Sequence, residues 1–375
     1  MNLTRAIVLT LIVVLSVSVA AFPQEGSQQT IKAVKCARLI DVRNGIAIQN
    51  AVIFIEGDKI KAVATDVKVP TGVEVIDLGN ATVLPGLIDC HTHLLENYTG
   101  AISGADHIIL TIAQMSTAKR ALLGVAMGRE DLEAGITTVR DLGNSGWSGD
   151  VALRDAINAG WVTGPRIVAS TRALSAAGGQ FGPVVTEAQK IIDQEYFVIS
   201  GVEEARRAVR QAFYDGADLI KVIVNTGPRV LSLEEMKVIV EEAHRVGKKV
   251  AAHATDELST RIAAEAGVDS IEHGYDLSDA VLSMMAEKKI YLVPTDFTVE
   301  SYLETMSKPR NPTPEQLKEQ ERQTRYAYSF SRKRLERAIN AGVPIAAGSD
   351  MYYIWPARRV GRPAWQWCAP MPNLE

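Results

Sequence analysis

The order of hydrophobic and polar residues divides the chain into two regions. From about residue 30 to residue 77, apolar and polar residues alternate in short runs, as in "AVIFIEGDKIKAV", and Gly57-Asp58 stands at a turn position between two runs. Alternation with a period of two is typical of β-strands, and a Gly-Asp pair between such runs predicts a hairpin. We therefore expect a small β-domain, of the β-sandwich kind, over residues 25–84.

The second region, after residue 84, alternates short apolar runs with amphipathic helical segments. Eight apolar runs are present, at residues 86–91, 136–141, 166–171, 219–224, 249–254, 270–274, 291–295 and 344–350. Between them, apolar residues recur with a helical period, and Ser232 with Glu235 predicts a capping box at the start of one helix. After Gly201, for example, one helical face collects Val202, Ala205, Val209, Ala212 and Phe213.

Strands that alternate with helices are typical of a parallel sheet covered by helices. Eight such strands over residues 85–350 match the roughly 250 residues of a (β/α)8 TIM barrel, and we predict that α/β fold. A doubly wound sheet is the alternative, but it rarely needs eight parallel strands.

The two ends of the chain depart from these patterns. Residues 1–24 combine Arg5, an apolar run over residues 6–19 and a Ser-Val-Ala sequence that resembles a cleavage site, which predicts a secretory signal peptide. A retained membrane anchor is the alternative, but the run is shorter than the ~20 residues that span a bilayer. We therefore expect an exported protein, periplasmic or extracellular, that meets the membrane only during export.

Residues 351–375 show neither helical nor strand periodicity. We expect an irregular tail there, unrelated to the preceding pattern. Since the eighth run is then followed by no helix, we also expect the barrel and the small β-domain to be incomplete at the C-terminus.

Composition limits the function. The chain is 47% hydrophobic and 22% charged, as is ordinary for a soluble enzyme with a large core. A net charge of -4 provides no basic field for a nucleic-acid backbone, so the expected partner is a small-molecule substrate. Cys36, Cys90 and Cys368 are too few and too scattered for a disulfide framework or a thiolate metal site. The sequence leaves open whether the chain forms a homo-oligomer.

Polar residues gather at the C-terminal ends of the predicted strands, where a TIM barrel places catalysis. They are His91, His93, Lys221, His253, His273 and Asp350. The spacing of His91 and His93 puts both imidazoles on one side of an extended strand. Taken singly, a strand histidine is more often a hydrogen-bonded core residue than a ligand. Together these residues predict a metal site, because buried unpaired imidazoles and carboxylates are costly.

Lys221 lies inside an apolar run, where loss of hydration lowers the pKa of its ammonium group. It could pair with a carboxylate as a structural residue. Alternatively, its neutral amine could capture carbon dioxide and become a carbamate that bridges two divalent metals. With four histidines and an aspartate nearby, we favour the carbamate.

The motifs together resemble the amidohydrolase superfamily, and within it the Xaa-Pro dipeptidase and imidazolonepropionase-like group. The resemblance covers about residues 30–350 and rests on "VLPGLIDCHTHL", "GITTVRDLG", "DLIKVIVNTG", "AAHATDE", "SIEHGYDL" and "AAGSD". It implies two zinc ions, with His91, His93 and Asp350 on one, His253 and His273 on the other, and carboxylated Lys221 between them. It also implies a metal-bridging hydroxide that attacks the substrate, with Asp350 as the catalytic acid and base.

Because the substrates of this group are dipeptides and N-acyl amino acids, the resemblance implies cleavage of an amide bond in a small substrate such as an Xaa-Pro dipeptide. It also implies a site for a free carboxylate. Arg172, Tyr275 and Arg229 are the candidates, although a solvated loop cation or a packed phenol is the alternative for each. Gln180 follows a glycine pair where the group often has histidine, which affects substrate contacts but not the metals.

Two other functions remain open. A mononuclear enzyme of the imidazolonepropionase or deaminase type would use one metal and would not need Lys221. An inactive, truncated fragment would account for the irregular tail, although all six metal-binding positions are present.

Overall fold

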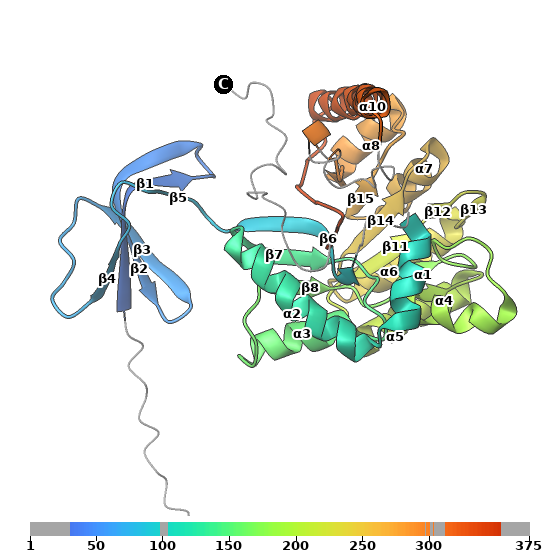
Figure 1. Cartoon of the computed structure of the whole chain (residues 1–375), viewed down its shortest axis with the longest axis horizontal. Helices are drawn as coiled ribbons and strands as arrows, with labels where there is room; N and C mark the ends of the chain where they lie inside the picture. The colour runs from blue at the N-terminus through green and yellow to red at the C-terminus, as the bar shows by residue number, and fades with distance from the viewer. Residues whose placement is uncertain (1–30, 98–103, 297, 301–302, 304–311, 354–375) are drawn as a thin grey trace, which may run out of the picture. The chain divides into compact units, whose positions relative to one another are not determined.

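The computed structural model describes residues 31–97, 104–296, 298–300, 303 and 312–353. The chain divides into two compact units, Met1–Pro85 and Gly86–Glu375, and each is described by itself (Figure 1). The predicted signal peptide lies outside the described residues, as does the predicted tail beyond residue 353.

The first unit is a five-stranded sheet with the order β3-β2-β1-β4, and β5 also pairs with β1. Its strands are β1 (Ile31–Asp41), β2 (Ile46–Glu56), β3 (Lys59–Thr65), β4 (Glu74–Asp77) and β5 (Thr82–Val83). The hairpin predicted at Gly57-Asp58 is confirmed, because Glu56 pairs with Lys59 across it and Gly57 has a φ of +61°.

The described residues of this unit form one sheet rather than the two packed layers of a sandwich. A single sheet cannot bury both faces, so large apolar side chains such as Ile60 and Val63 are exposed. Among residues 31–85, only the centre of β2 and two residues of β1 are well buried.

The second unit is built on parallel strands surrounded by helices (Figure 1). Its main strands are β6 (Leu87–Asn97), β7 (Ile136–Asp141), β8 (Arg166–Ala169), β9 (Ala173–Ser175), β11 (Ile220–Ile223), β14 (Val250–Ala254), β15 (Ser270–His273) and β16 (Tyr291–Val293). The short strands are β10 (Tyr196–Val198), β12 (Asn225–Thr226), β13 (Arg229–Val230) and β17 (Met351–Tyr353). Seven of the eight predicted apolar runs coincide with these strands, because strands buried on both faces read as continuous apolar runs.

Two irregular segments close the strands into a barrel. The third predicted strand, residues 166–171, ends at Thr171, which has a φ of +59°. Strand β8 lies within this run and pairs with β7, and β9, which follows the run, pairs with β11. On the other side, Ala346 N–H donates to Leu292 O of β16 over 3.0 Å, and Cys90 N–H of β6 donates to Ala347 O over 2.8 Å. The predicted (β/α)8 barrel is therefore confirmed.

The eighth predicted run, residues 344–350, occupies a strand position but is not a regular strand. Asp350 at its end has a φ of +53°, which interrupts an extended backbone. Strand β17 begins at the next residue and pairs with β6, Met351 opposite Thr92. The expectation that the tail lacks strand structure is therefore wrong for its first three residues.

Helices separate the strands as the apolar period predicts. They are α1 (Gly104–Gln114), α2 (Thr117–Glu133), α3 (Gly149–Asn158), α4 (Gln189–Glu195) after the 3-10 turn Thr186–Ala188, α5 (Val202–Tyr214), α6 (Leu233–Arg245), α7 (Glu257–Ala266), α8 (Asp279–Lys288) and α10 (Pro314–Asn340). The capping box of α6 is confirmed, since the Ser232 and Glu235 side chains each accept from the other residue's backbone N–H. Val209 and Ala212 of α5 are fully buried in the main core.

Among the described residues, no single helix is both long and apolar enough to cross a membrane. The bent pair Ile108–Gln114 and Thr117–Glu133 meets the criterion together, by length and composition alone.

Candidate active site

The six side chains predicted from the strand ends surround one cavity of about 120 Å³. His91 and His93 come from β6, Lys221 from β11, His253 from β14 and His273 from the last position of β15. Asp350 ends the stretch that fills the eighth strand position. The remaining lining residues are Leu142, Asn144, Ala173, Gln180, Tyr196, Ile223 and Tyr275. Residues far apart in the sequence therefore meet in one place.

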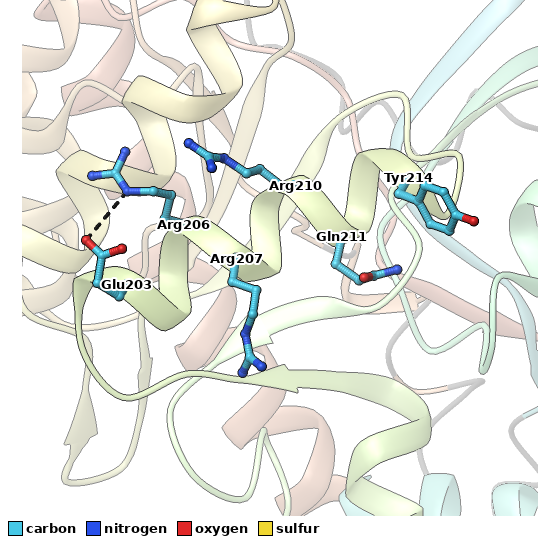
Figure 2. A pocket seen from close by; sticks show the side chains of 6 residues that line it. All are labelled: Glu203, Arg206, Arg207, Arg210, Gln211 and Tyr214. Atoms are coloured by element: carbon cyan, nitrogen blue, oxygen red, sulfur yellow. Dashed lines mark ion pairs between the residues drawn. The ribbon is translucent and has the colours of Figure 1, made fainter.

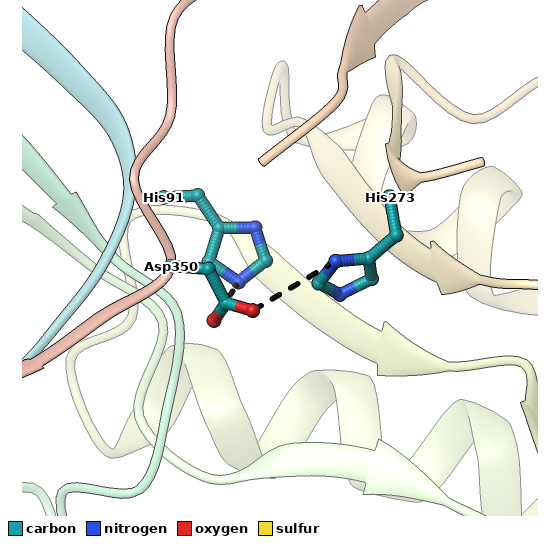
Figure 3. Close-up of side chains that lie close together, drawn as sticks. All are labelled: His91, His273 and Asp350. Atoms are coloured by element: carbon teal, nitrogen blue, oxygen red, sulfur yellow. Dashed lines mark ion pairs between the residues drawn. The ribbon is translucent and has the colours of Figure 1, made fainter. Parts of the chain in front are cut away.

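Asp350 lies among three imidazoles. Its Oδ1 is 3.4 Å from His91 Nε2 and 3.2 Å from His93 Nε2, and its Oδ2 is 3.8 Å from His273 Nδ1. Figure 3 shows the carboxylate between the rings of His91 and His273. One nitrogen or oxygen from each of these three residues lies within 4.8 Å of the others, so they could hold a metal ion.

His253 and Lys221 complete the cluster. The His253 ring is 4.5 Å from the His273 ring, centroid to centroid. The Lys221 side chain is buried on β11, whose neighbour β14 carries His253. Burial lowers the pKa of Lys221 to about 8, despite the opposing charges of Glu272 and Asp350. A substantial fraction of its amine is therefore neutral near pH 8.

The imidazoles of His91 and His93 on β6 are oriented by hydrogen bonds at Nδ1, the ring nitrogen that faces away from Asp350. His91 Nδ1 lies 2.8 Å from Glu272 Oε2, and His93 Nδ1 lies 2.9 Å from the Gly143 carbonyl oxygen. Each Nε2 is thereby directed toward Asp350. A carboxylate or carbonyl behind the imidazole is the usual arrangement around a metal-binding histidine.

Glu272 was not identified from the sequence. It is fully buried on β15, and it accepts from Arg140 Nη2 over 2.7 Å and from Ser270 Oγ over 2.5 Å. Burial opposes its ionisation, but the charge of Arg140, the hydrogen bond to His91 and the charges of His91 and Lys221 together outweigh burial and hold the pKa of Glu272 well below its ordinary range. The sequence did contain a signal for Glu272, because it is a charged residue inside the predicted buried strand at residues 270–274. Arg140 thus forms an ion pair with this buried carboxylate.

The backbone is left-handed at three residues of the site. His273, Thr295 and Asp350 have φ angles of +70°, +52° and +53°. Such conformations cost roughly 1–3 kcal/mol each in residues other than glycine and persist where the surrounding structure fixes them. Thr295 Oγ1 lies 2.8 Å from His273 Nδ1, so a hydrogen bond joins the side chains of two of these residues.

Burial sets the charge states of the cluster. Burial, together with the positive charge of Lys221, lowers the pKa of His91 to about 4 and that of His253 to about 3. Burial opposes ionisation of Asp350, but the neighbouring imidazoles outweigh it and hold its pKa well below its ordinary value. At neutral pH His91 and His253 are therefore neutral imidazoles and Asp350 is a carboxylate, the forms that bind divalent metals.

A model of the amidohydrolase family matches residues 82–355. The chain belongs to the amidohydrolase family. An ochratoxinase from Aspergillus niger is 29% identical over 345 residues, which cover 84% of this chain and 68% of that protein. A solved prolidase complexed with N-methylphosphonate-L-proline is 27% identical, with a TM-score of 0.72 over 86% of this chain and 79% of that one. A solved Xaa-Pro dipeptidase with bound methionine is 29% identical, with a TM-score of 0.69 over 86% of this chain and 80% of that one.

These similarities confirm the predicted family and identify the chain as a hydrolase that acts on amide C–N bonds. Amidohydrolases are generally metal-dependent, and His91, His273 and Asp350 are placed to bind a metal ion. Small molecules are the substrates expected of such an enzyme. The barrel fold rules out the doubly wound sheet considered as an alternative.

Of the three residues predicted to bind substrate, only Tyr275 lines the cavity of this amidohydrolase. Its hydroxyl lies 3.5 Å from His273 Nδ1. The guanidinium carbon of Arg172 instead lies over two rings, 4.1 Å from the Trp147 centroid and 3.7 Å from the Phe197 centroid. It also donates to the Asp193 carbonyl oxygen over 2.9 Å. Arg172 therefore has a packing role away from the cavity.

Arg229 also lies outside the cavity lining. Its guanidinium donates to the carbonyl oxygens of Ala177 and Phe181. Three other polar residues line it: Asn144 and Tyr196, which the sequence did not place at the site, and Gln180, which the sequence linked to substrate contacts. Of these, only Gln180 had a signal in the sequence, its position after a glycine pair.

A second hollow, of about 390 Å³, lies on the outer surface of α5 (Figure 2). All its lining residues belong to this one helix: Glu203, Arg206, Arg207, Arg210, Gln211 and Tyr214. Arg206 and Arg210 both pair with Glu242 of α6, over 2.6 and 2.9 Å. Two of its arginines are thus engaged in packing between helices, and its one carboxylate, Glu203, has no histidine or second carboxylate beside it in the lining. The cavity around Asp350 is the better candidate for the active site.

Proposed function

We propose that this amidohydrolase is metal-dependent and cleaves the amide bond of a small substrate such as an Xaa-Pro dipeptide or an N-acyl amino acid. The observation that carries the proposal is the convergence of four histidines, a lysine and an aspartate on one cavity. The cavity, at about 120 Å³, is smaller than the roughly 300–1,000 Å³ of typical ligand pockets, which favours a small group at the reacting centre. Similarity to a prolidase and an Xaa-Pro dipeptidase supports the dipeptide class.

We propose that the cluster would hold a pair of zinc ions. We assign His91, His93 and Asp350 to one ion and His253 and His273 to the other. Neutral imidazole and carboxylate are ordinary zinc ligands. When bound, a metal pair lowers the pKa of a water molecule and polarises the scissile carbonyl.

Lys221 would supply the bridging group. Its neutral amine can attack carbon dioxide, forming one N–C bond and releasing one proton, which leaves an anionic carbamate. Burial favours this reaction by lowering the pKa of the amine to about 8. The carbamate replaces a buried positive charge with an oxygen donor beside the imidazoles.

Asp350 would move the proton. Its low pKa keeps the carboxylate ionised at neutral pH, able to accept the proton of the attacking water. The same oxygen can then donate that proton to the leaving amine nitrogen. Glu272 and the Gly143 carbonyl keep His91 and His93 oriented throughout, because each binds the far nitrogen of its imidazole.

A substrate panel and a metal count test this proposal. Xaa-Pro dipeptides and N-acyl amino acids are assayed with added zinc, beside a His91→Ala control. We expect turnover by the wild type, its loss in the control, and two zinc ions per chain by elemental analysis. One zinc ion per chain would favour the mononuclear alternative. Full zinc loading without turnover of any panel substrate would overturn the proposed substrate class and favour the inactive fragment.

We also propose export, on the composition of residues 1–24 alone. Mass spectrometry of the protein expressed with these residues tests it. A mature N-terminus near residue 21 is expected, and an intact N-terminus in an exported fraction would argue for a retained anchor.

A further inference from the structure

The loop of residues 177–181 is enclosed from two sides. Its two glycines, Gly178 and Gly179, have φ angles of +84° and +59°, which favour glycine. A Cβ atom on Gly178 would overlap the guanidinium of Arg229, and one on Gly179 would overlap the ring of Tyr196. Both positions therefore require glycine, because Arg229 and Tyr196 pack directly against the loop backbone there.

Arg229 fixes both ends of this loop. Nη1 donates to the Ala177 carbonyl oxygen, and Nη2 donates to the Phe181 carbonyl oxygen over 2.8 Å. The Phe181 ring is fully buried, with its centroid 5.4 Å from that of Tyr196 in an edge-to-face contact. A planar guanidinium suits this task, because its fork can hold two acceptors at once.

Gln180 stands between the two fixed ends and lines the cavity. The Tyr196 hydroxyl donates to Gln180 Oε1 over 3.3 Å, and Gln180 Nε2 lies 3.5 Å from His253 Nδ1. Burial raises the pKa of Tyr196, so its hydroxyl stays protonated and remains a donor. With Oε1 occupied, the amide N–H groups of Gln180 are directed toward His253 and the cavity.

We infer that Arg229 is a positioning residue, which holds the loop so that Gln180 presents an N–H donor to an acceptor oxygen of the amide substrate. This inference rests on the proposed function, since it assigns the substrate contact to Gln180 at the same cavity. Arg229 itself does not touch the substrate. The alternative is that Arg229 caps two carbonyls for stability only.

Hydrogen exchange tests, without an assay of activity, whether Arg229 holds the loop. Two amides report on the loop, since Gly179 N–H donates to Ala176 O and Phe181 N–H donates to Gly178 O. In the zinc-loaded full chain, Arg229→Met should raise exchange of peptides covering residues 177–181 at least about tenfold, the loss of roughly one hydrogen bond. Peptides from β6 and β15, and the zinc content, should not change. Arg207→Met on the exposed face of α5 is the control. Unchanged loop exchange would overturn the inference.

A double-mutant cycle tests the route through Gln180. With an accepted panel substrate, Gln180→Ala and Arg229→Met should each raise KM roughly tenfold with little change in kcat, as expected for the loss of one hydrogen bond. The double variant should be no worse than Gln180→Ala alone, because Arg229 acts through Gln180. Additive losses would contradict this route. If the wild type accepts no panel substrate, the proposed function fails, and loop exchange still decides whether Arg229 holds the loop.

Discussion

The cavity has two walls that are built in different ways. The ligand wall consists of the six residues His91, His93, Lys221, His253, His273 and Asp350, which lie on barrel strands or at the end of the stretch in the eighth strand position. The loop wall consists of Asn144, Gln180 and Tyr275, which lie between elements. Strand register brings the first group together, since β14 pairs with both β11 and β15.

The loop wall depends instead on arginines that reach to the backbone. Arg229 holds the loop of Gln180, as described above. Arg120, which is fully buried, donates to the carbonyl oxygens of Leu95 and Asn144 and pairs with Glu195 over 2.6 Å. A ladder of backbone hydrogen bonds fixes a strand, whereas a loop needs side chains to satisfy its carbonyls. We therefore expect changes in the ligand wall to affect metal binding and changes in the loop wall to affect substrate binding.

The largest effect is expected from Lys221→Ala in the ligand wall. It removes the proposed bridging oxygen donor, and kcat/KM should fall by about 10³-fold with loss of bound zinc. A short carboxylate such as acetate should restore part of both, because it can occupy the vacated position. Zinc content and kcat/KM are measured beside Lys249→Ala, an exposed lysine paired with Asp269. A Lys221→Ala variant that keeps two zinc ions and full activity would remove Lys221 from the ligand wall.

The sequence predicted the ligand wall because strands are periodic. The run at residues 136–141 matches β7 at both ends, and an HxH spacing in a strand defines which side both imidazoles face. Asp350 could be placed because it closes an apolar run, although that run is not a regular strand and β17 begins only after it ends.

The loop wall could not be predicted in the same way. Arg172 and Arg229 follow strands and were placed at the site, but a loop position does not determine where a long side chain points. Both guanidiniums are directed to carbonyl oxygens and rings elsewhere. Glu272 was missed for a related reason, because its partner His91 is distant in the sequence and only the closed barrel brings them within 2.8 Å.

A change at Glu272, which contacts the ligand wall from behind, tests whether zinc binding depends on the orientation of His91 as well as on its presence. Glu272→Gln removes the charge that faces His91 Nδ1 but keeps an oxygen that can accept from Arg140. Zinc affinity should fall by about 10–100-fold, as for other residues behind metal-binding histidines. Competition with a chelator measures the affinity, with Glu242→Gln on α6 as the matched control. Equal zinc affinity in wild type and Glu272→Gln would show that the orientation of His91 does not depend on this carboxylate.

Tyr275→Phe changes the loop wall by one hydroxyl. The ring still packs near Arg334, whose guanidinium carbon lies 5.3 Å from the ring centroid, so the loop should keep its shape. We expect KM to rise by less than about tenfold, the value of one hydrogen bond, with the zinc content unchanged. Tyr291→Phe on the exposed side of β16 is the control. Loss of zinc from Tyr275→Phe would show that Tyr275 contributes to metal binding, and would contradict the assignment of metal binding to the ligand wall and substrate binding to the loop wall.

The smallest effect is expected at Glu242, which belongs to neither wall. Its carboxylate is buried, and a hydrogen bond from Arg210, assisted by Arg206, lowers its pKa to about 2. A group whose pKa is lower in the folded state stabilises the fold above its unfolded pKa, and this contribution is lost as pH falls through the folded value. Since Arg210 is more than half exposed, we expect only about 1 kcal/mol.

The free energy of unfolding of metal-free wild type and Glu242→Gln, measured from pH 7 to pH 3, tests this. The wild type should be more stable by about 1 kcal/mol at pH 7, and the difference should shrink below about pH 4.5, where the unfolded carboxylate takes up its proton. Zinc affinity and kcat/KM at pH 7 should match the wild type, because no contact joins Glu242 to the cavity lining in the part of the chain that the structure describes. A pH-independent difference would mean that the glutamine variant is destabilised by packing rather than by loss of charge.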